Sequence, residues 1–437
     1  MKTVFHLSPC ALLAMSGIAQ AQDAAPPDVA PYILTTLLFL VGGFLVFWMA
    51  AGFAMLEAGL VRSKNVTMQL TKNVALFSLA ATMYYLTGFG LMYPADWTVA
   101  GVLGPLFSPT VLDAVGLTAD DAALDYASAG SDFFFQLMFC ATTASIVSGT
   151  LAERIKLWPF LGFTVLLTGF IYPIEASWQW GGGWLADAGF SDFAGSTLVH
   201  AAGGFAALAG AIVLGPRIGR YPGGRAVPMP GSNLALATLG TFILWLGWFG
   251  FNGASQLAAG TVGDISDVSR IFANTNAAAA GGALAALALT QLVYGKVDLT
   301  MVLNGALAGL VSITAEPLMP SLGGATLIGA VGGGIVVFAV PMLDRLRIDD
   351  VVGAIPVHLL AGIWGTMAVP LTNDAASFGA QSLGLLAVGG FVFATSLAAW
   401  LVIDRLTGLR ASPEDEIAGL DVAELGMEAY PEFARGQ

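Results

Sequence analysis

The sequence predicts an all-α integral membrane protein, and three observations support this fold class. Of the 437 residues, 57% are hydrophobic and only 10% are charged, whereas a soluble domain carries about 25% charged residues. A water-soluble fold cannot cover so much apolar surface, because its exterior needs polar side chains. The apolar runs are also longer than the alternating strands of a membrane β-barrel, which have about ten residues each.

Eleven segments are apolar enough to form membrane-spanning helices, which need about 20 residues each. Two of them contain stretches rich in glycine and alanine, at 277–290 and 323–334, that suit close helix contact in lipid. The predicted helices cover residues 32–60, 70–93, 132–151, 157–176, 193–214, 232–253, 271–294, 299–315, 323–343, 351–370 and 381–404.

The basic residues predict the orientation of these helices, because Lys and Arg collect in cytoplasmic loops. With the N-terminus outside, 14 of the 15 basic residues that follow Lys2 lie on the inside, and only Arg270 lies outside. The segment 94–131 has no Lys or Arg, as expected of an outer loop. An even number of helices would break this pattern, so the C-terminus is expected inside.

The chain is expected to have three parts. A basic start, an apolar stretch at 11–18 and the sequence A-Q-A at 19–21 form the pattern of a secretory signal peptide over residues 1–21. The apolar stretch is too short to span a bilayer. Residues 22–406 would form the transmembrane domain, and residues 407–437 a cytoplasmic tail.

Composition excludes several classes of function. The net charge of −13 argues against a nucleic-acid partner, and the high hydrophobicity excludes intrinsic disorder. The two cysteines, Cys10 and Cys140, are too few for a metal cluster or a disulfide framework. The sequence has no nucleophile–base set and no nucleotide-binding motif, so neither an enzyme nor a cofactor is expected.

One internal repeat carries the candidate chemistry. Residues 192–200 and 350–358 both read D-x-x-G-x-x-x-V-H, and each histidine is followed four residues later by a glycine. The two motifs open predicted helices that are five apart in the chain and therefore run in opposite directions. This pattern indicates an inverted repeat of helices 1–5 and 6–10, with an eleventh helix added, and a transport site at the repeat interface.

The spacing within the repeat places two histidines at the same depth. Asp192 and Asp350 would cap the N-termini of their helices. His200 and His358 lie eight residues further on, about 12 Å along an α-helix, so both reach the middle of a core about 30 Å thick. An ionisable residue at that depth indicates a functional site. The alternatives are a purely structural histidine pair and a metal site, for which two histidines alone are a poor ligand set.

These residues resemble the Amt/Mep/Rh family of ammonium transporters, in particular its bacterial Amt branch. The resemblance covers about residues 32–430. Its most specific pieces are residues 192–200, the run GWFGFNGAS at 247–255, AERI at 152–155, and Val357-His358. It implies a homotrimer in the inner cell membrane that transports ammonium and its analogue methylammonium.

The resemblance also implies roles for single residues at the outer side. Trp180 and Ser255 would form an ammonium recruitment site, and Phe135 would help to line it. A cation over an indole face gains about 0.5–2 kcal/mol. Below this site, Phe139 and Phe251 would form a stacked pair that closes the pore.

Further matched positions lie deeper. His200 and His358 would line the pore, Trp248 and Thr275 are also matched to pore-lining positions, and Asp192 would support the site structurally rather than bind substrate. The chain departs from the pattern at Gly353, because some family members carry an acidic residue five positions before the second histidine. The helix cap must then come from Asp350 or Asp349. Glu57, near the inner end of the first predicted helix, receives no role from the sequence.

The predicted mechanism combines these parts. Ammonium binds at the outer aromatic site, loses a proton, and ammonia crosses the hydrophobic pore while the histidine pair relays the proton. Potassium cannot lose its charge, and a bare charge crosses an apolar pore only at high cost. An ammonium sensor of the same fold and a channel for neutral ammonia or carbon dioxide stay open as alternatives. A sodium-coupled carrier would need a mid-helix acidic pair, which the sequence lacks.

Two regions outside the pore are expected to contribute. The outer loop should attract cations through its acidic residues, which are Asp113, Asp120, Asp121 and Asp125. Residues 408–430 form a polar, acidic segment that by composition is only a solvated tail. By resemblance it is a regulatory tail that packs under neighbouring protomers and to which PII-family signal proteins dock.

Overall fold

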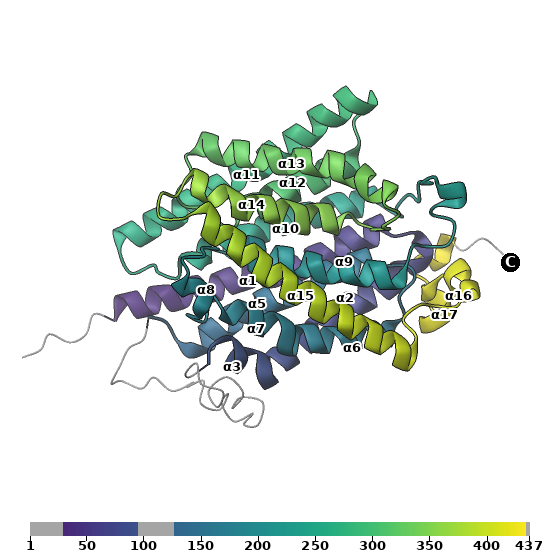
Figure 1. Cartoon of the computed structure of the whole chain (residues 1–437), viewed down its shortest axis with the longest axis horizontal. Coiled ribbons are helices and arrows are strands. Elements are labelled where there is room, and N and C mark those ends of the chain that lie inside the picture. The colour runs from purple at the N-terminus through teal and green to yellow at the C-terminus, as the bar shows by residue number, and fades with distance from the viewer. Residues whose placement is uncertain (1–28, 95–125, 434–437) are drawn as a thin grey trace, which may run out of the picture.

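The computed structural model describes residues 29–94 and 126–433, and within these ranges the regular elements are helices. Figure 1 shows the long helices side by side in one bundle. Nine helical stretches of the described chain are long and apolar enough to span a membrane, and two shorter apolar ones cover Leu299–Ile313 and Ile355–Leu371. Together they overlap all eleven predicted ranges. The all-α membrane fold class is confirmed, whereas eleven crossings with the N-terminus outside stay a prediction.

The helices have the following bounds. The α-helices are α1 (Ala30–Leu60), α2 (Val66–Met83), α3 (Phe89–Met92), α5 (Ala129–Thr150), α6 (Leu157–Leu166), α7 (Tyr172–Ser177), α8 (Trp184–Asp187), α9 (Ala202–Leu214), α10 (Leu234–Gly253), α11 (Val262–Tyr294), α12 (Leu299–Ile313), α13 (Leu322–Arg345), α14 (Ala361–Ala368), α15 (Phe378–Thr407), α16 (Pro413–Ala418) and α17 (Leu420–Leu425). The π-helical turns are η3 (Tyr84–Gly88), η6 (Leu167–Ile171), η7 (Ser196–Ala201) and η10 (Ile355–Leu360). The 3-10 turns are η2 (Ser63–Asn65), η8 (Pro222–Gly224), η9 (Ala254–Gln256), η11 (Val369–Leu371) and η12 (Pro431–Phe433).

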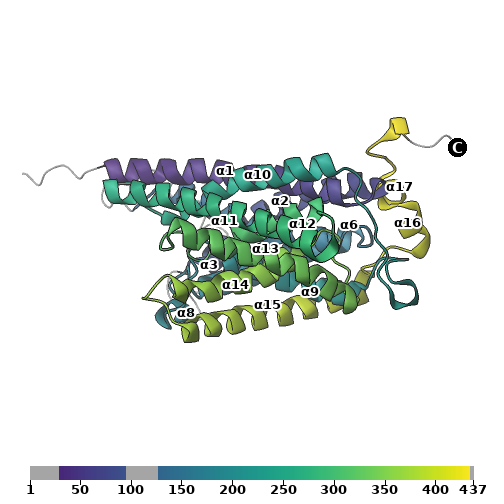
Figure 2. The same ribbon diagram turned by 90° about the horizontal axis from the view of Figure 1, so that it is seen from above.

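Small residues let the helix backbones approach closely. The two stretches rich in glycine and alanine pack against each other through α11 and α13, where a Cβ on Gly329 would lie 2.0 Å from the carbonyl oxygen of Ala278. Helices α1 and α10 lie along each other (Figure 2), and a Cβ on Gly240 would lie 2.3 Å from the backbone nitrogen of Leu56. Packing of this kind replaces the hydrophobic effect, which does not drive helices together within lipid.

Charged residues join the helix ends at one end of the bundle, which we call the inner end, following the predicted orientation. Arg217 binds the Asp349 carboxylate through Nε at 2.8 Å and Nη2 at 2.9 Å, and its Nη1 lies 3.2 Å from Glu153. Arg62 pairs with the same glutamate. Arg154 donates from Nη2 to the backbone oxygen of Asp349 at 2.7 Å. These contacts connect loops that are distant in sequence.

The C-terminal segment packs against this inner end of its own chain. Figure 1 shows α16 and α17 at the end of α2 and α6. The Asp421 carboxylate accepts the backbone N–H groups of Thr67 at 3.0 Å and Met68 at 2.7 Å, and so caps α2. Glu416 accepts the N–H of Ile218 at 2.6 Å. The described part of the tail is therefore docked on the bundle.

Some predictions concern residues for which the structure gives no description. The predicted signal peptide lies outside the described ranges, as do the acidic residues of the outer loop, Asp113, Asp120, Asp121 and Asp125.

The substitution Asp349→Asn tests the inner charge cluster. Burial alone would raise the pKa of Asp349, but hydrogen bonds from Arg217 and the charges of Arg154 and Arg217 hold it well below its usual range. The carboxylate therefore stabilises the fold above the unfolded-state pKa of about 3.9, and this contribution is lost as the pH falls towards the folded-state pKa. Removing one partner of a buried pair costs about 3–5 kcal/mol.

We expect Asp349→Asn to melt at lower temperature than the wild type in detergent, with a constant difference between pH 8 and pH 5. The difference should shrink below about pH 4, because the carboxylate of the unfolded wild-type chain then binds a proton while that of the folded chain stays ionised, which favours unfolding. Equal melting temperatures at neutral pH would show that the cluster does not stabilise the fold.

Candidate functional site

The two histidines lie on π-helical turns that begin half-helices inside the bundle. His200 is on η7, which leads into α9, and His358 is on η10, which leads into α14. Single π turns are rare and often occur at functional sites. Both helices begin several residues after the motif aspartates, at Ser196 and Ile355. The rise of about 12 Å expected for an unbroken α-helix therefore does not apply.

The motif aspartates satisfy the backbone at these helix starts. The Asp192 carboxylate accepts the N–H groups of residues 195–198 at 2.8–3.1 Å. The Asp350 carboxylate accepts those of Gly353 at 3.2 Å and Ile355 at 2.7 Å. Inside a membrane every such donor needs a partner within the protein. Of the two residues that the sequence offered as the second cap, the structure uses Asp350.

The first glycine of each motif is required by the backbone. Gly195 has φ 102° and Gly353 has φ 81°, a region that residues with a Cβ rarely adopt. A Cβ at position 353 would also lie 2.5 Å from Nδ2 of Asn304. An acidic side chain at this position would therefore be doubly unfavourable here.

The second glycine of each motif touches the other motif. A Cβ on Gly204 would lie 2.7 Å from the backbone nitrogen of Leu359, and one on Gly362 would lie 2.5 Å from the backbone oxygen of Ser196. The half-helices therefore cross at backbone contact, each next to the histidine of the other. This reciprocal contact explains why the repeat includes a glycine four residues after each histidine.

The crossing brings the imidazoles together. Nδ1 of His200 and Nδ1 of His358 lie 3.2 Å apart, with ring centroids at 5.2 Å and an angle of 22° between the planes. Both rings are buried. Nε2 of His200 has no hydrogen-bond partner in the described part of the chain. Within the same ranges no third His, Cys, Asp or Glu joins the pair in a metal-binding group.

Aromatic rings form a continuous column on the outer side of this pair. The Phe251 ring lies 5.3 Å from His200 and 4.2 Å from Phe139, measured between ring centroids. Phe139 in turn lies 5.8 Å from Trp180, with the rings edge to face. The two phenylalanines are buried and lie between Trp180 and His200 in this column.

An outer pocket of about 340 Å³ opens above the column. The indole N–H of Trp180 donates to the backbone oxygen of Asp192 at 2.9 Å, which fixes the ring. The Ser255 hydroxyl donates to the backbone oxygen of Phe251 at 2.8 Å. The pocket lining includes Gln136, Phe139, Gln179, Trp180, Asp192 and Ser255.

Three further residues predicted at the site do not line the outer pocket. Phe135 is absent from the pocket lining, because its ring stacks on Phe39 of α1 at 5.2 Å and supports Phe139 at 4.8 Å. Trp248 lies 4.9 Å from the His200 ring, and its Nε1 donates to Thr314 at 2.8 Å. The Thr275 hydroxyl accepts a hydrogen bond from Asn252 at 3.0 Å. These residues position the column.

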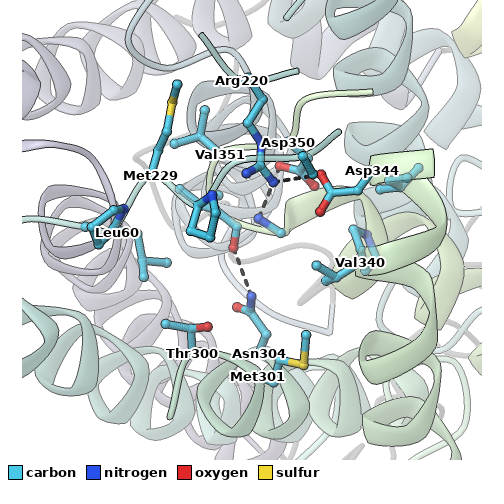
Figure 3. Close-up of a pocket in the computed structure, with 18 of the residues that line it drawn as sticks. Leu60, Arg220, Met229, Thr300, Met301, Asn304, Val340, Asp344, Asp350 and Val351 are labelled. Atoms are coloured by element: carbon cyan, nitrogen blue, oxygen red, sulfur yellow. Dashed lines mark hydrogen bonds and ion pairs between the residues drawn. The ribbon is translucent and has the colours of Figure 1, made fainter. Parts of the chain in front are cut away.

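Two hollows lie on the inner side of the histidines. The inner cavity has a volume of about 10 Å³ and is lined by His358, Glu57 and Ser145, among others. The inner vestibule has about 510 Å³ and shares Asn304 with that cavity. Figure 3 looks into the vestibule, where Asn304 donates to the backbone oxygen of Val352 at 3.0 Å.

Comparison with known proteins identifies the family of this chain. The sequence model of the Ammonium Transporter Family matches residues 37–430. The chain belongs to this family. It is 40% identical to ammonium transporter Amt2 of Archaeoglobus fulgidus, over 90% of this chain and 87% of the relative. It is 41% identical to a putative ammonium transporter of Synechocystis, over 94% and 92% of the two chains.

Solved structures of family members share the fold. A protein described as a sensor Amt protein superposes with a TM-score of 0.81 at 32% identity, over 90% of this chain and 98% of its own. Mep2 of Candida albicans gives 0.79 at 27% identity, over 93% and 94%. The chain is thus a multi-pass membrane transporter with ammonium as its substrate, and not an enzyme.

Two residues near the candidate site were not predicted from the sequence, and a third, Glu57, was named there without a role. Gln136 and Gln179 line the outer pocket, and Glu57 lines the inner cavity. The two glutamines are polar residues next to the aromatic residues that carried the resemblance, and this adjacency was the available signal. The π turns left no signal, because they depend on tertiary contacts.

Substitution of the motif glycines tests the half-helix crossing. Gly204→Ala and Gly362→Ala should force the half-helices apart, since each new methyl group would meet backbone atoms within 3 Å. We expect transport of radiolabelled methylammonium into proteoliposomes to fall strongly, with the protein still monodisperse. Gly390→Ala is the matched control, because nothing lies within 4 Å of its Cβ position. Unchanged transport in both motif variants would refute a crossing as tight as described.

Proposed function

We propose that this transporter binds ammonium in the outer pocket, deprotonates it and conducts ammonia past the phenylalanine pair, with the two histidines relaying the proton. The single observation that carries the proposal is the hydrogen-bonded imidazole pair at the inner end of the closed aromatic column. A proton and a neutral molecule can each use such a site, whereas a metal cation cannot. Net transport of ammonium results when a proton and an ammonia molecule both cross the membrane.

The chemistry of the outer pocket suits an ammonium ion. Trp180 presents an aromatic surface, and cation–π attraction is worth about 0.5–2 kcal/mol. The amide oxygens Oε1 of Gln136 and Gln179 are buried and have no hydrogen-bond partner among the described residues. Ammonium has four N–H donors, so acceptors of this kind can replace its water shell. Ser255 adds a further acceptor, since its own proton is donated to Phe251.

Selectivity would come from deprotonation. The Phe139 and Phe251 rings leave no room for a hydrated ion, and an unhydrated charge in an apolar path is costly. Potassium retains its charge, but ammonium loses a proton and continues as neutral ammonia. In the histidine pair, one Nδ1 donates and the other accepts, so a proton that arrives on one ring can leave from the other.

The same proposal extends to the setting of the protein. We place it in the inner membrane as a homotrimer, with residues 1–21 as a signal peptide, residues 22–406 as the transmembrane domain and residues 407–437 as a regulatory tail. A PII-type protein would bind at this tail and so act on the helix ends that Asp421 and Glu416 hold. Pull-down with a PII protein at low and high 2-oxoglutarate tests the partner, and no binding under either condition would remove it.

Currents in proteoliposomes on a solid-supported membrane test the transport mechanism. An ammonium pulse should give a current in the wild type, and His200→Ala and His358→Ala should reduce it by about tenfold or more while potassium gives none. If both variants retained the wild-type ammonium current and still excluded potassium, the relay role of the two histidines would be contradicted.

A sensor role is the second candidate, favoured by the similarity to a structure described as a sensor Amt protein. It predicts that the wild type binds ammonium without a sustained current or methylammonium uptake. A neutral-gas channel predicts ammonia permeation without any current. The same liposome measurements therefore separate the three functions.

A further inference from the structure

Glu57 is a buried carboxylate on α1 that the proposed pore does not yet use. Only 1% of its surface is exposed, three residues before the helix ends at the inner side. Its Oε2 accepts hydrogen bonds from Gln69, from Asn73 at 2.7 Å and from the Ser148 hydroxyl at 3.0 Å. Buried acidic groups within a membrane are costly and are kept chiefly where they serve transport.

A buried lysine balances the charge of this carboxylate without binding it directly. Lys72 on α2 is 1% exposed, and its Nζ donates to the backbone oxygen of Ser148 at 3.0 Å. The same Nζ lies 4.7 Å from the centroid of the Phe160 ring. Since Lys72 forms no ion pair with Glu57 at contact distance, the glutamate is not locked in a salt bridge.

The second carboxylate oxygen of Glu57, Oε1, is available to the pore. Oε1 accepts none of the hydrogen bonds that fix the side chain through Oε2. Glu57 lines the inner cavity together with His358, and these two are the titratable residues of its lining. Lys72 from α2 is not part of the cavity lining, while α5 contributes the uncharged Ser145 to the lining and the Ser148 hydroxyl to Glu57.

The size of the cavity fits a bridging water molecule. Its volume of about 10 Å³ is close to the space that the centre of one water molecule needs. The cavity shares Asn304, Val352 and Gly353 with the inner vestibule. Gly353 supplies no carboxylate there, so Glu57 is the one acid that the described residues place in this cavity.

We propose that Glu57 is the inner proton acceptor of the transport path. This inference rests on the proposed function, because it needs protons to reach the histidine pair. The N–H bond of the protonated His358 ring breaks, one water molecule passes a proton on, and an O–H bond forms at Oε1 of Glu57. The carboxyl group then gives its proton to ammonia or water in the inner vestibule, which regenerates the carboxylate.

The substitution Glu57→Gln tests this role, since it preserves size but cannot accept a proton at neutral pH. Purified variants in liposomes would be measured for ammonium current and, by an internal pH dye in stopped flow, for ammonia permeation. We expect the current to fall by about tenfold or more and the ammonia permeation to stay at the wild-type rate. Glu57→Asp should restore part of the current and shift its pH dependence.

Control variants separate a proton role from a structural one. Asn73→Leu removes one hydrogen bond to Glu57 but leaves the carboxyl group, so it should retain most of the current. Glu57→Gln with wild-type current would overturn the proposal, as would a parallel loss of current and permeation in monodisperse protein. If Glu57→Gln does not fold, Glu57→Asp decides: an unchanged pH dependence of the current refutes the role.

The same experiment distinguishes failure of this inference from failure of the proposed function. A wild type without ammonium current would refute net ammonium transport itself. A wild-type current that depends on His200 and His358 but not on Glu57 would refute the inference alone.

Discussion

The hydrogen bond between the two imidazoles is the interaction on which the rest of this site depends. It requires two helices that enter the bundle from opposite ends and do not cross it as unbroken α-helices. Each must place its histidine at the same depth. Helix starts inside a membrane leave N–H groups that water cannot reach. Asp192 and Asp350 solve this problem by accepting those groups, so the two caps are as necessary to the geometry as the histidines.

The symmetry of the repeat has a direct physical explanation. Each half-helix supplies a capping acid, a glycine with positive φ, a histidine, and a second glycine against which the opposite half-helix packs. The glycines therefore set the distance between the backbones, and the backbone distance sets the distance between the rings. The aromatic column follows, since Phe251 and Trp248 of α10 pack directly on the His200 ring.

Much of this arrangement could be predicted from the sequence, because hydrophobic length and motif symmetry are local signals. The eleven apolar ranges, the packing of the two stretches rich in glycine and alanine, and the meeting of His200 with His358 all agree with the structure. Positions that depend on side-chain direction could not be predicted. Phe135 stacks on Phe39 of α1 instead of lining the pocket, and the environment of Glu57 is built from α2, the next α-helix along the chain, and from α5, which is distant in sequence.

The π turns at the two histidines have a consequence for how such a pore can change over time. A π turn holds one more residue than an α turn, and in an α-helix one residue corresponds to about 100° of rotation. The angular register of each imidazole is therefore determined by a single residue in segments 196–201 and 355–360. A one-codon deletion in either segment would turn a histidine away from its partner while the composition of the helix stayed almost the same. A mutation can thus create or remove the histidine pair without creating or removing the membrane fold.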